Sequence, residues 1–142
     1  AYMYSAIIIA RYIINKKFEE GAPVNNERLQ SLLYLAQGQS YRTRKEPLFE
    51  ENIYAWKQGP VVPDVFWTYA GYLTTNIRNH YEIKLDEHTK ILIDNLLNIL
   101  DNLDDSTLEQ IVCEKDSPWS RFSKAQTTKI PKKQLEKYFL SL

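Results

Sequence analysis

The clearest helix pattern in this 142-residue chain is the stretch NNERLQSLLYLAQGQSYRT, residues 25–43. Its apolar side chains recur at helical spacing. They are Leu29, Leu32, Leu33, Ala36 and Tyr41. Asn25 suits an N-cap, because its side-chain oxygen can accept a free backbone N–H of the first turn. The stretch therefore predicts a helix over about residues 26–43 with one buried face.

Apolar spacing, prolines and cap residues predict further helices on both sides of this stretch. The expected segments are residues 4–18, a helix with Pro63 at its first position, residues 87–100 after the cap Asp86, a helix from the capping box Ser106–Glu109 to about Cys113, a turn from Pro118, and residues 131–142. In the first, we expect Ile7, Ile8 and Tyr12, with Ile14 or Phe18, to form the buried stripe. After Pro63, the expected buried side chains are Val65, Phe66, Tyr69 and Leu73.

Two short stretches are typical of strands. Ile53–Trp56 has the composition of a strand, and the segment Lys57-Gln58-Gly59-Pro60 after it predicts a turn. Thr127–Ile130 is the second candidate, and we expect the two to pair, because a lone strand would leave backbone groups without partners. The predicted fold is mainly α (α+β): residues 1–142 form a single compact helical domain with a small two- or three-stranded antiparallel sheet.

The composition is that of an ordinary globular protein, with 44% hydrophobic and 25% charged residues. Cys113 is the only cysteine, so packing rather than internal disulfides must stabilise the chain. No apolar run approaches the roughly 18 residues needed to cross a bilayer, and residues 1–18 do not resemble a signal peptide. We therefore expect a soluble, cytoplasmic protein without a membrane segment.

The charges are balanced overall but unevenly distributed. Residues 82–116 carry three basic and ten acidic groups, whereas residues 117–142 carry six basic groups and one acidic group. We expect these two segments to attract each other within the fold; the alternative is a polar surface for a partner. A net charge of zero argues against nucleic-acid binding, although the basic C-terminal segment keeps that possibility open.

The residues that could carry catalysis are few and scattered. Four separated glycines form no phosphate-binding loop and no dinucleotide-binding motif. A zinc site made by His80, His88 and Cys113 is conceivable, but surface histidines and a buried cysteine are the preferred interpretation. We expect no enzyme activity, no cofactor and no metal.

The most distinctive candidate site is a protein-binding one. It comprises Trp56, Lys57, Gln58, Gly59, Pro60, Trp67 and Tyr69. Tryptophan and tyrosine are frequent anchors at protein interfaces, and a tight turn holds its neighbours with little freedom left to lose on binding. The alternative interpretation is that the whole block only joins a strand to a helix.

Several of these segments resemble one known family. LQSLLYLAQG (29–38) resembles the "LQKLLYFAQG" helix of the Panacea domain, the phage-associated SocA- and GepA-like family. Pro47-Leu48-Phe49 and AWKQGPVVPDV (55–65) resemble its second block, "AWKYGPVVPEVY", and Pro118-Trp119 resembles its later Pro-Trp motif. The order and separation of the blocks also match. Gln58 stands where tyrosine is common, and Val112-Cys113 or Cys113-Glu114 stands where the family usually has Thr-His.

The resemblance implies an antitoxin, a function that periodicity cannot show. Panacea domains occur in bacterial and prophage toxin–antitoxin pairs, where they generally neutralise toxins by direct contact. One relative instead acts as a proteolysis adaptor that delivers its toxin to a protease. The family supplies no catalytic residues to carry over. The alternatives are a nucleic-acid-binding regulator that uses the basic C-terminal segment, and a prophage protein that binds a host or defence protein.

Overall fold

The computed structural model describes residues 3–123 and 128–142. In order, the described elements are α1 (Ala6–Glu19), α2 (Asn26–Arg44), β1 (Ile53–Trp56), β2 (Gly59–Val61), α3 (Pro63–Thr68), the short 3-10 helix η1 (Ala70–Tyr72), α4 (Glu87–Leu100), α5 (Asp105–Val112), α6 (Pro118–Phe122), β3 (Thr128–Ile130) and α7 (Lys132–Leu140). The fold is mainly helical with a small sheet, which confirms the predicted fold class. None of the described helices combines the length and apolarity needed to span a membrane.

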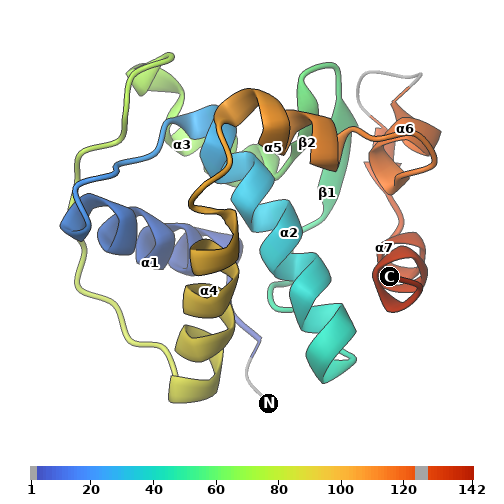
Figure 1. Cartoon of the computed structure of the whole chain (residues 1–142), viewed down its shortest axis with the longest axis horizontal. Coiled ribbons are helices and arrows are strands. Elements are labelled where there is room, and N and C mark those ends of the chain that lie inside the picture. Colours follow the sequence, from blue (N-terminus) through green and yellow to red (C-terminus); the bar gives the residue numbers. More distant parts are fainter. Residues whose placement is uncertain (1–2, 124–127) are drawn as a thin grey trace.

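Helix α2 lies at the centre of the molecule, with α1 and α4 on one side of it and α7 on the other (Figure 1). Helices α3 and α5 and strand β2 also contact it. The predicted apolar face of α2 is confirmed, because every member is at most 3% exposed. Burial of this face on several sides explains why the stretch carries the clearest pattern in the sequence.

The helix starts follow their cap residues, with one correction. Asn25 and Asp86 cap α2 and α4 as predicted, accepting hydrogen bonds from the backbone N–H of Arg28 and Thr89. The expectation that a capping box at Ser106 starts the next helix is wrong. Asp104 is the cap of α5, because its carboxylate accepts the Thr107 N–H at 2.8 Å. Asp105 is therefore the first helical residue.

The predicted buried faces of α1 and α3 need correction. In α1 the fully buried side chains are Ala6, Ile9, Ala10, Ile13 and Ile14, whereas the expected Ile7, Ile8 and Tyr12 are only half-buried. Isoleucine surrounds this helix on most sides, so spacing alone did not determine which face turns inward. After Pro63, Val65 and Tyr69 are buried as expected, but Phe66 is only half-buried and Leu73 is 78% exposed.

The sheet is antiparallel, with strand order β2-β1-β3. Ile53 pairs with Ile130 and Trp56 pairs with Gly59, so the expected pairing of the two strand candidates is confirmed. Thr127, the first residue of the predicted second strand, lies outside the described residues. Gly59 and Pro60 belong to β2 rather than to the turn, which leaves only Lys57 and Gln58 between the strands. Proline fits there because β2 is an edge strand.

The acidic segment pairs with the N-terminal helices. Lys16 contacts Asp94, Lys17 contacts Asp101, and Arg28 contacts Asp105. No ion pair among the described residues joins residues 82–116 to the basic C-terminal segment, so the expected attraction between these segments is not seen as direct ion pairs in that part of the chain. The acidic helices instead dock against α1 and α2.

Candidate partner-binding surface

The amide of Gln30 on α2 fixes the backbone where β2 leads into α3. Its Oε1 accepts the Val62 N–H at 2.9 Å, and its Nε2 donates to Asn26 Oδ1 at 3.0 Å. The Asn26 amide in turn donates to the Phe66 carbonyl at 3.0 Å. Because both amides are buried, each unmade bond would leave a costly unpaired polar group. The first turns of α2 therefore determine where the hairpin and α3 lie.

Gln37, two turns further along α2, fixes the other end of β1. Its Oε1 accepts the N–H groups of Leu48 and Phe49, and its Nε2 donates to the Phe49 carbonyl. The side chain is 1% exposed, so these bonds lie in the core. Gln30 and Gln37 thus hold the backbone before and after the β1–β2 hairpin.

The Pro-Trp pair holds the hairpin from the opposite side. Trp119 Nε1 donates to the Trp56 carbonyl at 2.6 Å, and Pro118 is buried at the start of α6. Ser117 caps this short helix by accepting the Ser120 N–H. The last residue of β1 is therefore attached to α6 as well as to β2.

Three aromatic rings gather beside the hairpin turn. The Trp56 ring centroid lies 5.2 Å from Phe66 and 6.0 Å from Trp67, and Phe66 lies 5.2 Å from Trp67. Trp67 is 65% exposed despite these contacts, and Lys57 and Gln58 are exposed in the turn. We name the set Trp56, Lys57, Gln58, Phe66 and Trp67 the hairpin surface.

The structure brings four of the seven predicted site residues to this surface and leaves the other three buried. Gly59 and Pro60 are buried in β2. Tyr69 is 2% exposed, and its hydroxyl lies 2.9 Å from that of Tyr81. Burial raises the pKa of Tyr69. These three residues are buried, whereas Trp56, Lys57, Gln58 and Trp67 are available for contact.

A cavity of about 310 Å³ opens next to the hairpin surface, between the start of α2, β2, α3–η1 and α5. We name it the α2–α5 pocket. Its apolar lining includes Pro60, Val61, Phe66, Ala70, Leu73 and Leu108. Its polar lining includes Asn26, Glu27, Arg28, Ser31, Asp105 and Glu109. The sequence carries no signal for this pocket, because Glu27 and Glu109 approach each other only through the docking of α5 on α2.

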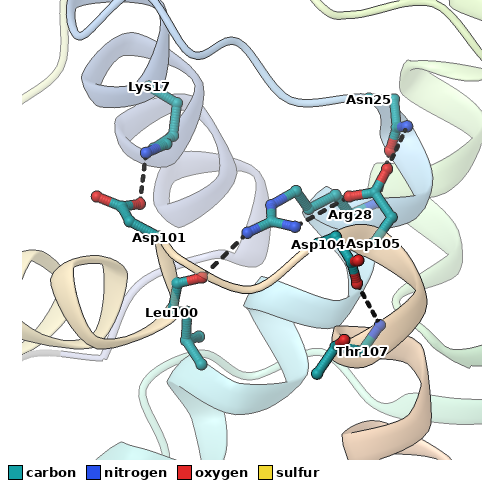
Figure 2. Close-up of polar contacts among 8 residues, drawn as sticks. All are labelled: Lys17, Asn25, Arg28, Leu100, Asp101, Asp104, Asp105 and Thr107. Carbon is teal, nitrogen blue, oxygen red and sulfur yellow. Dashed lines mark hydrogen bonds and ion pairs between the residues drawn. The ribbon is translucent and has the colours of Figure 1, made fainter.

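The acidic rim of the pocket is held by a set of ion pairs. Figure 2 shows Arg28 reaching from α2 to the Asp105 carboxylate and to the Leu100 carbonyl, at 2.9 and 3.2 Å. Asn25 donates to the same carboxylate, and Lys17 of α1 contacts Asp101 at 2.5 Å. These contacts fasten the loop between α4 and α5, and so fix α5 with its Glu109 against the start of α2.

Two acidic groups on the rim remain without a cation partner among the described residues, namely Glu27 and Glu109. Partial burial raises the pKa of Glu27, and the nearby carboxylates of Glu109 and Asp105 raise it further. A raised pKa means that the ionised carboxylate lacks compensation where it stands. The rim therefore favours an incoming positive charge.

The residues considered for metal binding lie in unrelated surroundings. His80 is exposed and contacts Glu19 at 3.0 Å, and His88 is exposed on α4. Cys113 is half-buried, and burial raises the pKa of its thiol to about 11. Across residues 3–123 and 128–142, no three His, Cys, Asp or Glu side chains are placed to hold a metal ion.

Comparison with known proteins agrees with these motifs. The family described as "Antitoxin SocA-like, Panacea domain" matches residues 29–120, which include most of α2, the hairpin surface, the Pro-Trp pair and most of the residues that hold them. No curated protein and no solved structure matches the chain significantly. Since the match covers well over half of its length, the chain belongs to the SocA-like antitoxin family of Panacea domains.

Proposed function

We propose that this protein neutralises a partner toxin by direct contact, and that the hairpin surface is where the toxin binds. The observation that carries the proposal is the exposure of Trp67 within a fixed aromatic cluster. A tryptophan that is 65% exposed leaves a large apolar area in contact with water, which binding would remove. The family supports an antitoxin role in general, and the surface supplies a place for it.

The hairpin surface is held in shape before any partner arrives. Gln30 fixes the end of β2, Trp119 fixes the end of β1, and two neighbouring rings restrict Trp67. A preorganised surface loses less conformational entropy on binding than a flexible one. With its flanks included, an interface of about 1,600 Å² in total would suffice to cover a toxin's active site.

Binding without catalysis is also what the chemistry of the surface supports. The hairpin surface contributes an ammonium, an amide and three aromatic rings, which anchor proteins well and lack the paired acid and base of a hydrolytic site. Cysteine often serves as a nucleophile in enzymes, but the thiol of Cys113 remains protonated because its pKa is raised to about 11. We therefore propose that the protein is not an enzyme.

The test is a double variant of the turn, Lys57→Glu with Gln58→Ala. The partner is first identified by co-expression and pull-down with the product of the neighbouring gene. Both changed residues are exposed, so the free energy of unfolding should change by less than about 0.5 kcal/mol. Affinity for the toxin and rescue of growth should both fall. Lys133→Glu with Gln110→Ala makes the same charge change at exposed positions outside the surface and should bind normally.

Direct neutralisation and delivery to a protease give different results with purified components. If contact alone suffices, a stoichiometric amount of this protein inhibits the toxin with no protease present. Inhibition that requires a protease would replace direct neutralisation with an adaptor mechanism. Full neutralisation by the Lys57→Glu, Gln58→Ala variant would move the binding site away from the turn.

A further inference from the structure

We infer that the α2–α5 pocket receives a lysine or arginine side chain of the partner protein. The inference rests on the proposed function, since it adds a second contact beside the hairpin surface, and it assigns that contact a chemistry. Gln58 and Phe66 border both features, so a protein seated on the hairpin surface would also cover the pocket opening.

The shape and lining of the pocket suit one long side chain. Its volume of about 310 Å³ lies at the lower end of the roughly 300–1,000 Å³ range of small-molecule pockets. Phe66, Val61 and Leu108 provide apolar walls that can contact methylene groups. Lysine and arginine bury such methylene stems against apolar surface while their charged ends stay near polar groups.

The charge distribution selects for a cation. Arg28, the basic residue in the lining, is already engaged by Asp105 and Leu100. Glu27 and Glu109 remain available on the exposed rim. Partial burial raises the pKa of Glu27, and the nearby carboxylates of Glu109 and Asp105 add to this effect. An ammonium or guanidinium group placed between Glu27 and Glu109 would relieve the repulsion among these carboxylates and gain charge-assisted hydrogen bonds.

A serine in the same lining adds a hydroxyl that is open to the pocket. Ser31 is 8% exposed and lines the pocket, and its hydroxyl makes no hydrogen bond to any other described residue. A hydroxyl in this position can accept a hydrogen bond from an ammonium or guanidinium N–H. The pocket therefore offers an acceptor on its wall as well as negative charge at its rim.

Helix capping does not explain this arrangement. Glu27 and Asp105 lie in the first turns of α2 and α5, where acidic residues stabilise the helix dipole. Glu109 lies beyond the first turn of α5 and gains nothing there. A metal ion is not the better occupant either, because no three carboxylates or other metal ligands among the described residues are placed to coordinate one.

The first experiment uses the whole protein with small probes and needs no partner. Agmatine and n-butylammonium, which carry a cation on an apolar stem, are titrated against the ¹⁵N-labelled protein, with n-pentanol as the neutral probe. We expect weak, millimolar binding of both cations, with amide shifts centred on Glu27, Ser31 and Leu108. Glu27→Gln with Glu109→Gln should weaken it about tenfold. Glu50→Gln with Glu82→Gln, which changes the net charge equally at exposed positions outside the pocket, should not.

The second experiment measures affinity for the partner toxin with the same two double variants. Of these two double variants, only Glu27→Gln with Glu109→Gln should bind the toxin about tenfold more weakly than the native protein. Its melting temperature should be unchanged. The inference would be overturned if pentanol bound as tightly as the two cations, or if the Glu27→Gln, Glu109→Gln variant bound the toxin with native affinity. Micromolar binding of free agmatine would also overturn it, because the pocket would then be a small-molecule site. If the native protein binds no toxin at all, the proposed function fails, whereas the probe titration still reports on the chemistry of the pocket.

Discussion

At the scale of single residues, Leu73 adopts a backbone conformation that glycine usually occupies. Its φ and ψ are 55° and −122°, and the Thr75 N–H donates to the Tyr72 carbonyl at 3.0 Å. These values match the first central position of a type II′ turn, where glycine is strongly preferred. Leu73 also lines the α2–α5 pocket and is 78% exposed. A strained, exposed leucine at a pocket rim suggests that its side chain is needed for contact rather than for folding.

Replacing Leu73 with glycine should separate these two roles. Leu73→Gly relieves a backbone conformation that costs roughly 1–2 kcal/mol and removes little buried area, so the melting temperature should stay the same or rise. Affinity for the partner should fall, because the apolar contact is lost. Leu73→Asn, which tolerates the same backbone, is the control for a change of side chain without glycine. A clear loss of stability in Leu73→Gly would show that the side chain packs in the fold, and unaltered affinity would remove it from the interface.

At the scale of elements, the sequence predicts a helix best where an N-cap residue marks its start. Helices α2 and α4 have strong apolar periodicity and an Asn25 or Asp86 cap, and both starts were predicted correctly. Helix α1 has isoleucine on most sides, so its buried face was misplaced. The sequence predicts a turn at Gly59 and Pro60 because these residue types usually mark one, yet an edge strand such as β2 tolerates both.

The candidate site likewise has one part that could be predicted from the sequence and one part that could not. All residues of the hairpin surface except Phe66 could be predicted, because they are neighbours in the chain or one short helix apart. The α2–α5 pocket could not, because Glu27 and Glu109 meet only after α5 docks on α2. Acidic residues at helix starts are common for local reasons, so neither carried a signal of its own.

The start of α4 provides a test of how a cap stabilises an element. Asp86 accepts hydrogen bonds from Tyr4 Oη and Thr89 Oγ1, both at 2.6 Å, and from the Thr89 N–H. Burial would raise the pKa of this carboxyl, but the hydrogen bonds outweigh it and lower the pKa from 3.8 to about 2. A lowered pKa stabilises the fold above the unfolded value of 3.8, and this contribution is lost as the pH falls towards 2.

The neutral amide of asparagine can still cap the helix but cannot make the charge-assisted hydrogen bonds of the carboxylate. We therefore expect Asp86→Asn to be less stable than the native protein by about 1 kcal/mol near neutral pH. The difference should shrink as the pH falls from about 4 towards 2, where the native carboxylate becomes protonated. Urea unfolding followed across this range measures it, with Glu82→Gln as an exposed control. A difference that is constant with pH would mean that the charge of Asp86 is not what stabilises the cap.

At the scale of the whole molecule, α2 connects the hairpin and the α2–α5 pocket to the C-terminal helix. Its first turns line the α2–α5 pocket and hold the hairpin through Gln30, while its later turns contact α7 (Figure 1). The contact with α7 depends on Gly38, because a Cβ at this position would lie 2.3–2.5 Å from ring atoms of Phe139. The glycine in the family's helix motif is therefore explained by packing.

Exchanging Gly38 for alanine tests whether this packing stabilises the whole fold. Alanine favours a helix over glycine by about 1 kcal/mol, yet we expect Gly38→Ala to destabilise the protein by about 1–3 kcal/mol. The Phe139 ring cannot easily move aside, because it packs against Tyr34 and Tyr138 with ring centroids 5.3 and 5.1 Å away. Thermal or urea unfolding of the single variant measures the loss.

The double variant identifies the cause of that loss. Phe139→Ala removes the ring that the new methyl group would strike, so adding Gly38→Ala to it should be neutral or stabilising by up to about 1 kcal/mol. Toxin affinity should stay native in both backgrounds, since neither residue belongs to the hairpin surface or lines the α2–α5 pocket. If Gly38→Ala costs as much without the Phe139 ring as with it, the close approach of α7 is not the reason for glycine. If it instead weakens toxin binding while stability is unchanged, the C-terminal half of α2 takes part in recognition, and the binding surface extends along the central helix.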